Sequence, residues 1–193
     1  MNNYPEYVEV NGRRYKINTD FRYAIKCNEI AQDSKLNDYE RSLAVIVTLF
    51  GKDSLDYPED YETLLKLALK YLSCGKEIVK DDKPDMDYIE DMDYIEASFQ
   101  SDYGMSLENT EMHWYKFTNL INGLSNSELG NCCILNRIRN LRNYDVSTIK
   151  DPKERDKIIK AQKEVELKRT SKENNLSKEQ EESMNKLNEL IGI

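Results

Sequence analysis

The stretch YVEVNGRRYKIN, residues 7–18, is the clearest local pattern in the sequence. Two alternating runs, 7–10 and 13–17, flank the pair Asn11 and Gly12. Asn-Gly readily adopts the positive φ angles of a type I′ turn, so the stretch predicts a two-stranded antiparallel hairpin. Nearly every segment that follows has helical spacing of its apolar residues. The sequence therefore predicts a mainly α fold with one short N-terminal β-hairpin and a helical core.

Helical segments are predicted from residue 19 to residue 143. Asp20 or Thr19 can cap the first helix, and Asn37 has capping-box spacing to Glu40 at the start of the second. The β-branched run 45–47 leaves a buried strand open as the alternative for that second segment. The predicted helices cover residues 21–31, 38–50, 58–74, 109–124 and 127–143, with Pro58 in the first turn of the third and Asn109 or Thr110 as the cap of the fourth.

The composition changes after residue 149. Residues 150–193 contain eleven basic and ten acidic residues, no aromatic residue and few apolar ones. Such a segment has good helix propensity but little apolar surface to bury. We therefore predict a helical domain with an N-terminal hairpin over 1–149, followed by a charged helical tail over 150–193.

The overall composition indicates a protein of the bacterial cytoplasm. At 193 residues, with 39% hydrophobic and 33% charged residues, the chain can form one ordinary core. It contains no apolar run of about 18 residues, and its N-terminus lacks a basic start followed by an apolar region, so we expect neither a membrane span nor a secretory signal. The four cysteines have no CxxC spacing, which favours reduced thiols.

Negative charge is concentrated in the middle of the chain. Residues 81–111 carry a net charge of −10, while the whole chain carries −8. Because phosphate binding requires clustered Lys and Arg, this acidic region argues against nucleic acid as a partner. Arg137, Arg139 and Arg142 could line one helical face, but a solvated or salt-bridged face is the better interpretation.

The six residues DMDYIE occur twice in succession, at 85–90 and 91–96. An EF-hand reading fails, because Ile89 and Glu90 occupy loop positions that require an oxygen ligand and a glycine. On a helix, Tyr88, Met92, Ile95 and Phe99 would share an apolar inner face and the carboxylates would form an outer face. We interpret the repeat as scaffold, without metal or acid–base chemistry.

No group of residues indicates catalysis. His113 is the single histidine, so a histidine-based zinc site or a catalytic triad would have to be built around it. A packed or surface role is the more economical interpretation of this histidine. Cys132 and Cys133 lack the basic or redox-motif setting that activates a thiol. The seven glycines form no phosphate-binding loop. We predict a protein that is not an enzyme and has no cofactor or metal.

Three segments in this order resemble a known family. They are INTDFRYAI, then YIEASFQSDYGMSL, then MHWYKFTNLINGLSNSELGNCCILNRIR. The sequence is similar to small proteins encoded in the tail-gene region of long-tailed bacteriophages and prophages of Gram-positive hosts. The resemblance covers roughly residues 5–142, and its most specific part is HWYKF following SFQSDYG. Asp93, Tyr94, Ile95 and Phe99 match the family signature, so the second DMDYIE copy is the matching one.

The resemblance implies a non-catalytic function. Proteins of this kind are regarded as tail assembly chaperones that bind the long helical tape-measure protein in the host cytoplasm and leave it as the tail-tube protein polymerises. They would be absent from the mature virion. The alternative is a structural protein of the virion tail or head–tail junction. An enzyme or nucleic-acid binder is the third class, and a homo-oligomer is left open.

The apolar stripe of the charged tail is the predicted partner-binding site. It consists of Ile158, Val165, Leu187 and Leu190, which a compact core of this size would leave uncovered. Such a stripe can pair with an amphipathic helix in a groove or a coiled coil. We expect deletion of residues 151–193 to spare folding and to remove partner binding.

Overall fold

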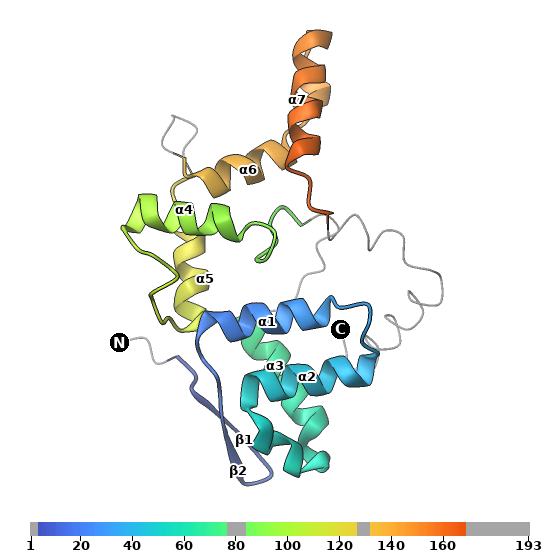
Figure 1. Ribbon diagram of the computed structural model, residues 1–193, viewed down its shortest axis with the longest axis vertical. Helices are drawn as coiled ribbons and strands as arrows, with labels where there is room; N and C mark the ends of the chain where they lie inside the picture. Colours follow the sequence, from blue (N-terminus) through green and yellow to red (C-terminus); the bar gives the residue numbers. More distant parts are fainter. Residues whose placement is uncertain (1–3, 77–83, 127–131, 169–193) are drawn as a thin grey trace. The chain divides into compact units, whose positions relative to one another are not determined.

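A computed structural model of the chain describes residues 4–76, 84–126 and 132–168 (Figure 1). Within these residues the chain forms two compact units. Unit 1 contains residues 4–76 and 111–120, and unit 2 contains residues 84–110, 121–126 and 132–168. The described part consists of α-helices, short 3₁₀ turns and one two-stranded antiparallel sheet. The predicted fold class, mainly α with an N-terminal hairpin, is confirmed.

The hairpin of unit 1 forms as the sequence predicts. Strand β1 spans Tyr7–Val10 and strand β2 spans Arg13–Lys16. The two turn residues have positive φ angles, 50° at Asn11 and 77° at Gly12. The register pairs Val8 with Tyr15 and Val10 with Arg13, so one face of the hairpin carries the buried Val10 and Tyr15. That face points into unit 1, and the opposite face remains exposed.

Two capped helices follow the hairpin. Helix α1 spans Phe21–Ala31, and the Asp20 side chain accepts a hydrogen bond from the Arg22 amide at its start. Helix α2 spans Asp38–Phe50 and begins with the predicted capping box between Asn37 and Glu40. Residues 45–47 are helical, so the strand alternative is wrong. Buried residues on the two helices, among them Cys27 and Ile46, form part of the core.

The third predicted helix begins three residues later than expected. Residues Lys52–Asp56 form the 3₁₀ turn η1, Pro58–Asp60 form a second 3₁₀ turn η2, and helix α3 spans Tyr61–Leu72. Pro58 therefore begins the 3₁₀ turn that precedes the α-helix. Leu64, Ala68 and Tyr71 bury the inner face of α3.

Helix α5, Trp114–Asn122, begins without the predicted cap at Asn109 or Thr110. Its start is fixed instead by a short strand-like pairing with the residues before α1. The Met112 amide donates to the Asp20 carboxylate at 3.0 Å, and the Trp114 amide donates to the Thr19 carbonyl at 2.8 Å. The rings of Phe21 and Phe117 stack at 4.3 Å between centroids in the core that results.

Unit 2 is built around two helices that pack side by side, as Figure 1 shows. Helix α4 spans Met92–Tyr103 and helix α6 spans Ile134–Asn143. The 3₁₀ turn η3, Val146–Thr148, and helix α7, Pro152–Glu164, follow. Ile95, Phe99 and Leu135 are fully buried in this unit. The buried Ser98 hydroxyl accepts a hydrogen bond from the Leu135 amide at 3.1 Å and thereby joins the two helices.

Only the second DMDYIE copy is helical. The first copy forms an extended segment and a turn that ends at Asp91. Asp87 closes this turn by accepting hydrogen bonds from the amides of Ile89 and Glu90 at 2.7 and 2.9 Å. Within the described residues, no helix is long and apolar enough to cross a membrane.

Candidate functional site

Helix α7 carries the described part of the predicted partner-binding stripe. Ile158 lies in the middle of α7 and is half-buried, while residues 151–157 are exposed. Val165 caps the helix at its C-terminal end and is also half-buried. Leu187 and Leu190 lie outside the described residues. The structure thus gives one predicted residue a place on the helix and one a place at its end.

The C-terminal end of α7 is attached to unit 2 by backbone and side-chain contacts. The Gln162 side-chain amide donates to the carbonyls of Leu141 and Tyr144 at 2.9 and 2.8 Å. Leu167, just beyond the helix, is 4% exposed. The Lys168 amide donates to the Glu90 carboxylate at 2.9 Å. Residues 162–168 are therefore part of the packing of unit 2, and the N-terminal part of α7 extends away from α4 and α6 (Figure 1).

Arg142 forms the centre of this attachment. Its two terminal nitrogens bond the two oxygens of Asp91, each at 2.7 Å, and one of them also donates to the Asp85 carbonyl at 2.8 Å. Its Nε donates to the Val165 carbonyl at 2.6 Å. The Asp91 side chain is 1% exposed and that of Arg142 is 9% exposed. A bidentate pair of this kind is geometrically specific, so it fixes the end of α7 against the start of α4.

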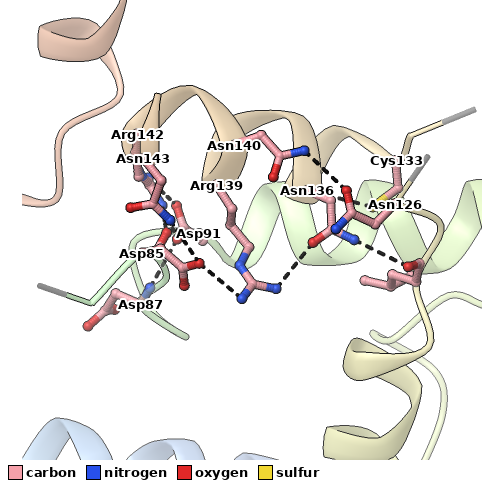
Figure 2. Close-up of polar contacts among 11 residues, drawn as sticks. Asp85, Asp87, Asp91, Asn126, Cys133, Asn136, Arg139, Asn140, Arg142 and Asn143 are labelled. Carbon is pink, nitrogen blue, oxygen red and sulfur yellow. Dashed lines mark hydrogen bonds and ion pairs between the residues drawn. The ribbon is translucent and has the colours of Figure 1, made fainter. Parts of the chain in front are cut away.

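Arg139 makes a second link one helical turn earlier. Figure 2 shows its guanidinium between Asp85 and Asn136. It forms an ion pair with Asp85 at 3.1 Å and donates to the Asn136 side-chain oxygen at 3.1 Å. Asn136 in turn donates to the carbonyls of Leu124 and Ser125, each at 3.2 Å. These contacts connect the acidic repeat, helix α6 and the end of the preceding helical segment within unit 2.

The outcome of the sequence analysis for these charges is mixed. The salt-bridged interpretation of the arginine face is confirmed for Arg139 and Arg142, while Arg137 is exposed. The outer acidic face is wrong for Asp87 and Asp91, which are buried. Their burial follows from the non-helical first copy and from the arginine partner. The signal that was available is the opposite charge of the repeat and the arginine segment.

Unit 1 contains a separate buried carboxylate. Asp60 is fully buried and accepts hydrogen bonds from the Asn11 side chain at 2.7 Å, from Arg13 at 2.8 Å and from the Tyr15 hydroxyl at 2.5 Å. The Tyr15 hydrogen bond, followed by those of Arg13 and Asn11, lowers the pKa of Asp60. Burial and the neighbouring Asp60 raise the pKa of Tyr15 to about 12. The cluster joins the hairpin to the start of α3.

The single histidine is packed rather than presented. The Tyr115 amide donates to His113 Nδ1 at 3.0 Å, so Nδ1 is the acceptor and Nε2 carries the hydrogen. That nitrogen donates to the Pro5 carbonyl at 3.1 Å, and the Tyr4 ring stacks on the imidazole at 4.8 Å. Both nitrogens are therefore engaged, which confirms the packed interpretation. All four cysteines are free thiols, and burial raises the pKa of Cys27 to about 12.

The described residues contain no group of three or more His, Cys, Asp and Glu side chains that could hold a metal ion. The charged clusters that the structure does contain are saturated by hydrogen bonds within their own unit. Together, the fold and these clusters define a mainly helical protein in which buried ion pairs join secondary-structure elements, with one helix extending from unit 2.

The family to which the chain belongs is the bacteriophage Gp15 protein family, whose model matches residues 1–167. The chain matches no curated protein and no solved structure. The family match ends at Leu167, the residue through which the segment after α7 is buried in unit 2. The match therefore includes α7 and its attachment to unit 2.

Proposed function

We propose that this bacteriophage protein is a tail assembly chaperone of a phage of Gram-positive bacteria. In this proposal it binds the tape-measure protein through non-covalent contacts and performs no catalysis. It acts in the host cytoplasm during assembly, is displaced as the tail-tube protein polymerises, and is absent from the finished virion. Membership of a bacteriophage family supports the setting of this proposal.

The structural observation that carries the proposal is the attachment of α7 by its C-terminal end. Gln162, the Val165 carbonyl and Leu167 hold that end against unit 2, whereas residues 151–157 at the other end are exposed. A helix presented in this way can pair with a long amphipathic helix through a narrow apolar stripe. The partner-binding stripe proposed is Ile158, Val165, Leu187 and Leu190.

The first experiment identifies the partner and the fate of the protein. The tagged chain is purified from cells in which the phage is producing particles, and co-purifying proteins are identified by mass spectrometry together with the protein content of purified virions. Recovery of the tape-measure protein, with this chain missing from virions, supports the proposal. A fixed copy number in virions would instead assign the chain to the virion structure and overturn the chaperone role.

The second experiment tests the stripe with purified components. Ile158→Ser reduces the affinity for a tape-measure fragment, because it removes a half-buried apolar side chain from the middle of α7. Glu154→Ser, an exposed position on the same helix, serves as the matched control and retains affinity. Equal affinities for the two variants would place the binding surface elsewhere. Circular dichroism verifies that both variants keep their helical content.

A further inference from the structure

Unit 1 carries a loop in which the usual distribution of polar and apolar residues is inverted. Ser54 and Asp60 are fully buried, and the five residues between them, Leu-Asp-Tyr-Pro-Glu, are all exposed. Leu55 is 37% exposed and Tyr57 is 41% exposed. Large apolar side chains are ordinarily buried, and polar ones are buried only when they are hydrogen-bonded. The burial of Ser54 and Asp60 therefore holds the loop with its apolar side chains outward.

The two polar anchors are fully bonded. The Ser54 hydroxyl donates to the Gly51 carbonyl at 2.6 Å, and Asp60 accepts hydrogen bonds from three hairpin side chains, as described above. Pro58, within the loop, fixes its own φ angle. A binding loop that is already ordered loses less conformational entropy when a partner binds. The loop is therefore preorganised for contact with another molecule.

The apolar surface continues from the loop onto two helices. The Tyr61 hydroxyl, at the start of α3, donates to the Leu55 carbonyl at 2.7 Å. Burial raises the pKa of Tyr61, and its neighbours Tyr39, Asp56 and Glu59 raise it further, which places Tyr39 beside Tyr61. Tyr39, at the start of α2, is 65% exposed. We call the set Tyr39, Leu55, Tyr57 and Tyr61 the tyrosine patch.

Charge surrounding the tyrosine patch has one predominant sign. Residues 52–62 contain five acidic residues and one lysine. Asp60 is buried against Arg13, but Asp53, Asp56 and Glu59 are exposed. Tyrosine rings attract cations over their faces, and Arg13 already occupies such a position 3.8 Å from the centroid of Tyr57. Apolar rings bordered by carboxylates are complementary to a segment that carries basic and apolar side chains together.

From this arrangement we propose that the tyrosine patch binds a segment of another protein rich in lysine or arginine and apolar residues. Tyrosine is enriched among the residues that dominate binding energy at protein interfaces. The contact is separate from the stripe on α7, since it uses only residues of unit 1. The proposal does not require the tape-measure protein to be the partner, so each of the two proposals can fail without the other.

Photo-crosslinking in particle-producing cells tests the proposal on the full chain. p-Benzoylphenylalanine replaces Tyr39 or Leu55, and Tyr23 on α1 is the matched control because it is 45% exposed in the same unit. We expect crosslinks at 39 and 55 but not at 23, mapped by mass spectrometry to a segment with net positive charge and apolar residues. An acidic or neutral segment, a second copy of this chain, or crosslinking equal to that at position 23 would overturn the proposal.

A synthetic peptide of the mapped segment then gives the affinity. The double variant Tyr39→Ser with Leu55→Ser should weaken binding about tenfold or more, as expected when interface anchors are lost. Binding should also weaken as salt rises, because the complementary charges are exposed. Tyr23→Ser should leave the affinity unchanged. Affinity that is insensitive to both the double variant and salt would contradict the assignment.

Discussion

Arg142 bonds both carboxylate oxygens of Asp91 and also donates to the carbonyl of Val165. One guanidinium thus joins three segments of unit 2: the last turn of α6, the start of α4 and the residue that ends α7. The bonded residues are separated by 51 positions in one direction and 23 in the other. The arrangement makes the end of α7 depend on the acidic repeat.

Replacement of Asp91 should therefore destabilise unit 2. Asp91→Asn leaves a nearly buried guanidinium without its counter-charge, which costs about 3 kcal/mol, the lower end of the range for such pairs. Hydrogen exchange in α4 and α6 measures the effect. Trp114 is the only tryptophan and belongs to unit 1, so its fluorescence follows the other unit. Asp93→Asn, an exposed carboxylate of the same repeat, is the control and should change stability by no more than about 0.5 kcal/mol.

The hydroxyl of Ser98 should be equally specific in its effect. Ser98→Ala leaves the buried Leu135 amide without its acceptor, and the free energy of unfolding of unit 2 should fall by about 1 to 3 kcal/mol. The Leu135 amide should exchange with solvent faster than in the parent protein. Ser101→Ala, on the exposed side of α4, should cause little change. Similar exchange at Leu135 in both variants would refute the bond.

The boundary chosen for truncation should decide whether unit 2 remains stable. A chain that ends at Ile149 loses the buried Leu167, the Gln162 hydrogen bonds and the carbonyl that Arg142 bonds. Because these contacts belong to unit 2, hydrogen exchange in α6 should accelerate in that chain. A chain that ends at Lys168 should keep exchange in α6 close to that of the parent. Identical exchange in the two truncated chains would show that the contacts of residues 162–168 add nothing.

Acid should weaken the link between the hairpin and α3. The hydrogen bonds to Asp60 place its pKa below the ordinary value of 3.8, so the folded state holds fewer protons than the unfolded state near that pH. The stabilisation is fully present above pH 3.8 and is lost as the pH falls through the lower folded value. Trp114 fluorescence during unfolding at a series of pH values below 5 measures this loss. Asp60→Asn should lower stability at neutral pH and flatten the acid dependence, whereas an unchanged slope would contradict the assignment.

Alkaline pH should destabilise unit 1 through two buried groups. The pKa of Cys27 is raised from 9.0 to about 12, chiefly because it is buried, and that of Tyr15 is raised from 10.0 to about 12. The unfolded state therefore releases these protons first, and stability falls as the pH rises above about 9. Cys27→Ala should flatten the dependence from pH 9, and Tyr15→Phe should flatten it from pH 10. Parallel curves for parent and variants would exclude these groups as the cause.

Local chemistry in the sequence predicted most of the secondary structure of unit 1. The Asn11-Gly12 turn, the Asp20 cap and the capping box at Asn37 depend on neighbouring residues only, and all three are present. The predicted cap of α5 failed because that helix begins in a pairing with residue 20, which lies 92 positions away. The later start of α3 has a similar origin, since the hairpin holds Asp60 at the turn before the helix.

The ion pairs of unit 2 could be predicted only in part. The excess of acid in the repeat and the three arginines of α6 indicated opposite charges, but neither pattern specified which residues meet. Asp87 and Asp91 were expected on an outer face because the repeat was treated as one continuous helix. The turn at 88–91 changes the direction of the chain, so carboxylates with helical spacing in the sequence are buried in the structure.

The two copies of DMDYIE also give unit 2 a tolerance to the loss of genetic material. Tandem duplications of this size are readily shortened by one copy, and removal of six residues would place Pro84 directly before the surviving copy. The surviving aspartate would still face Arg142 and lead into an unaltered α4. What would disappear is the ion pair between Asp85 and Arg139 and the turn closed by Asp87. The duplicated segment thus supplies one copy for the helix and a second that adds a dispensable brace, so a contraction of the gene would shorten the protein without erasing its central salt bridge.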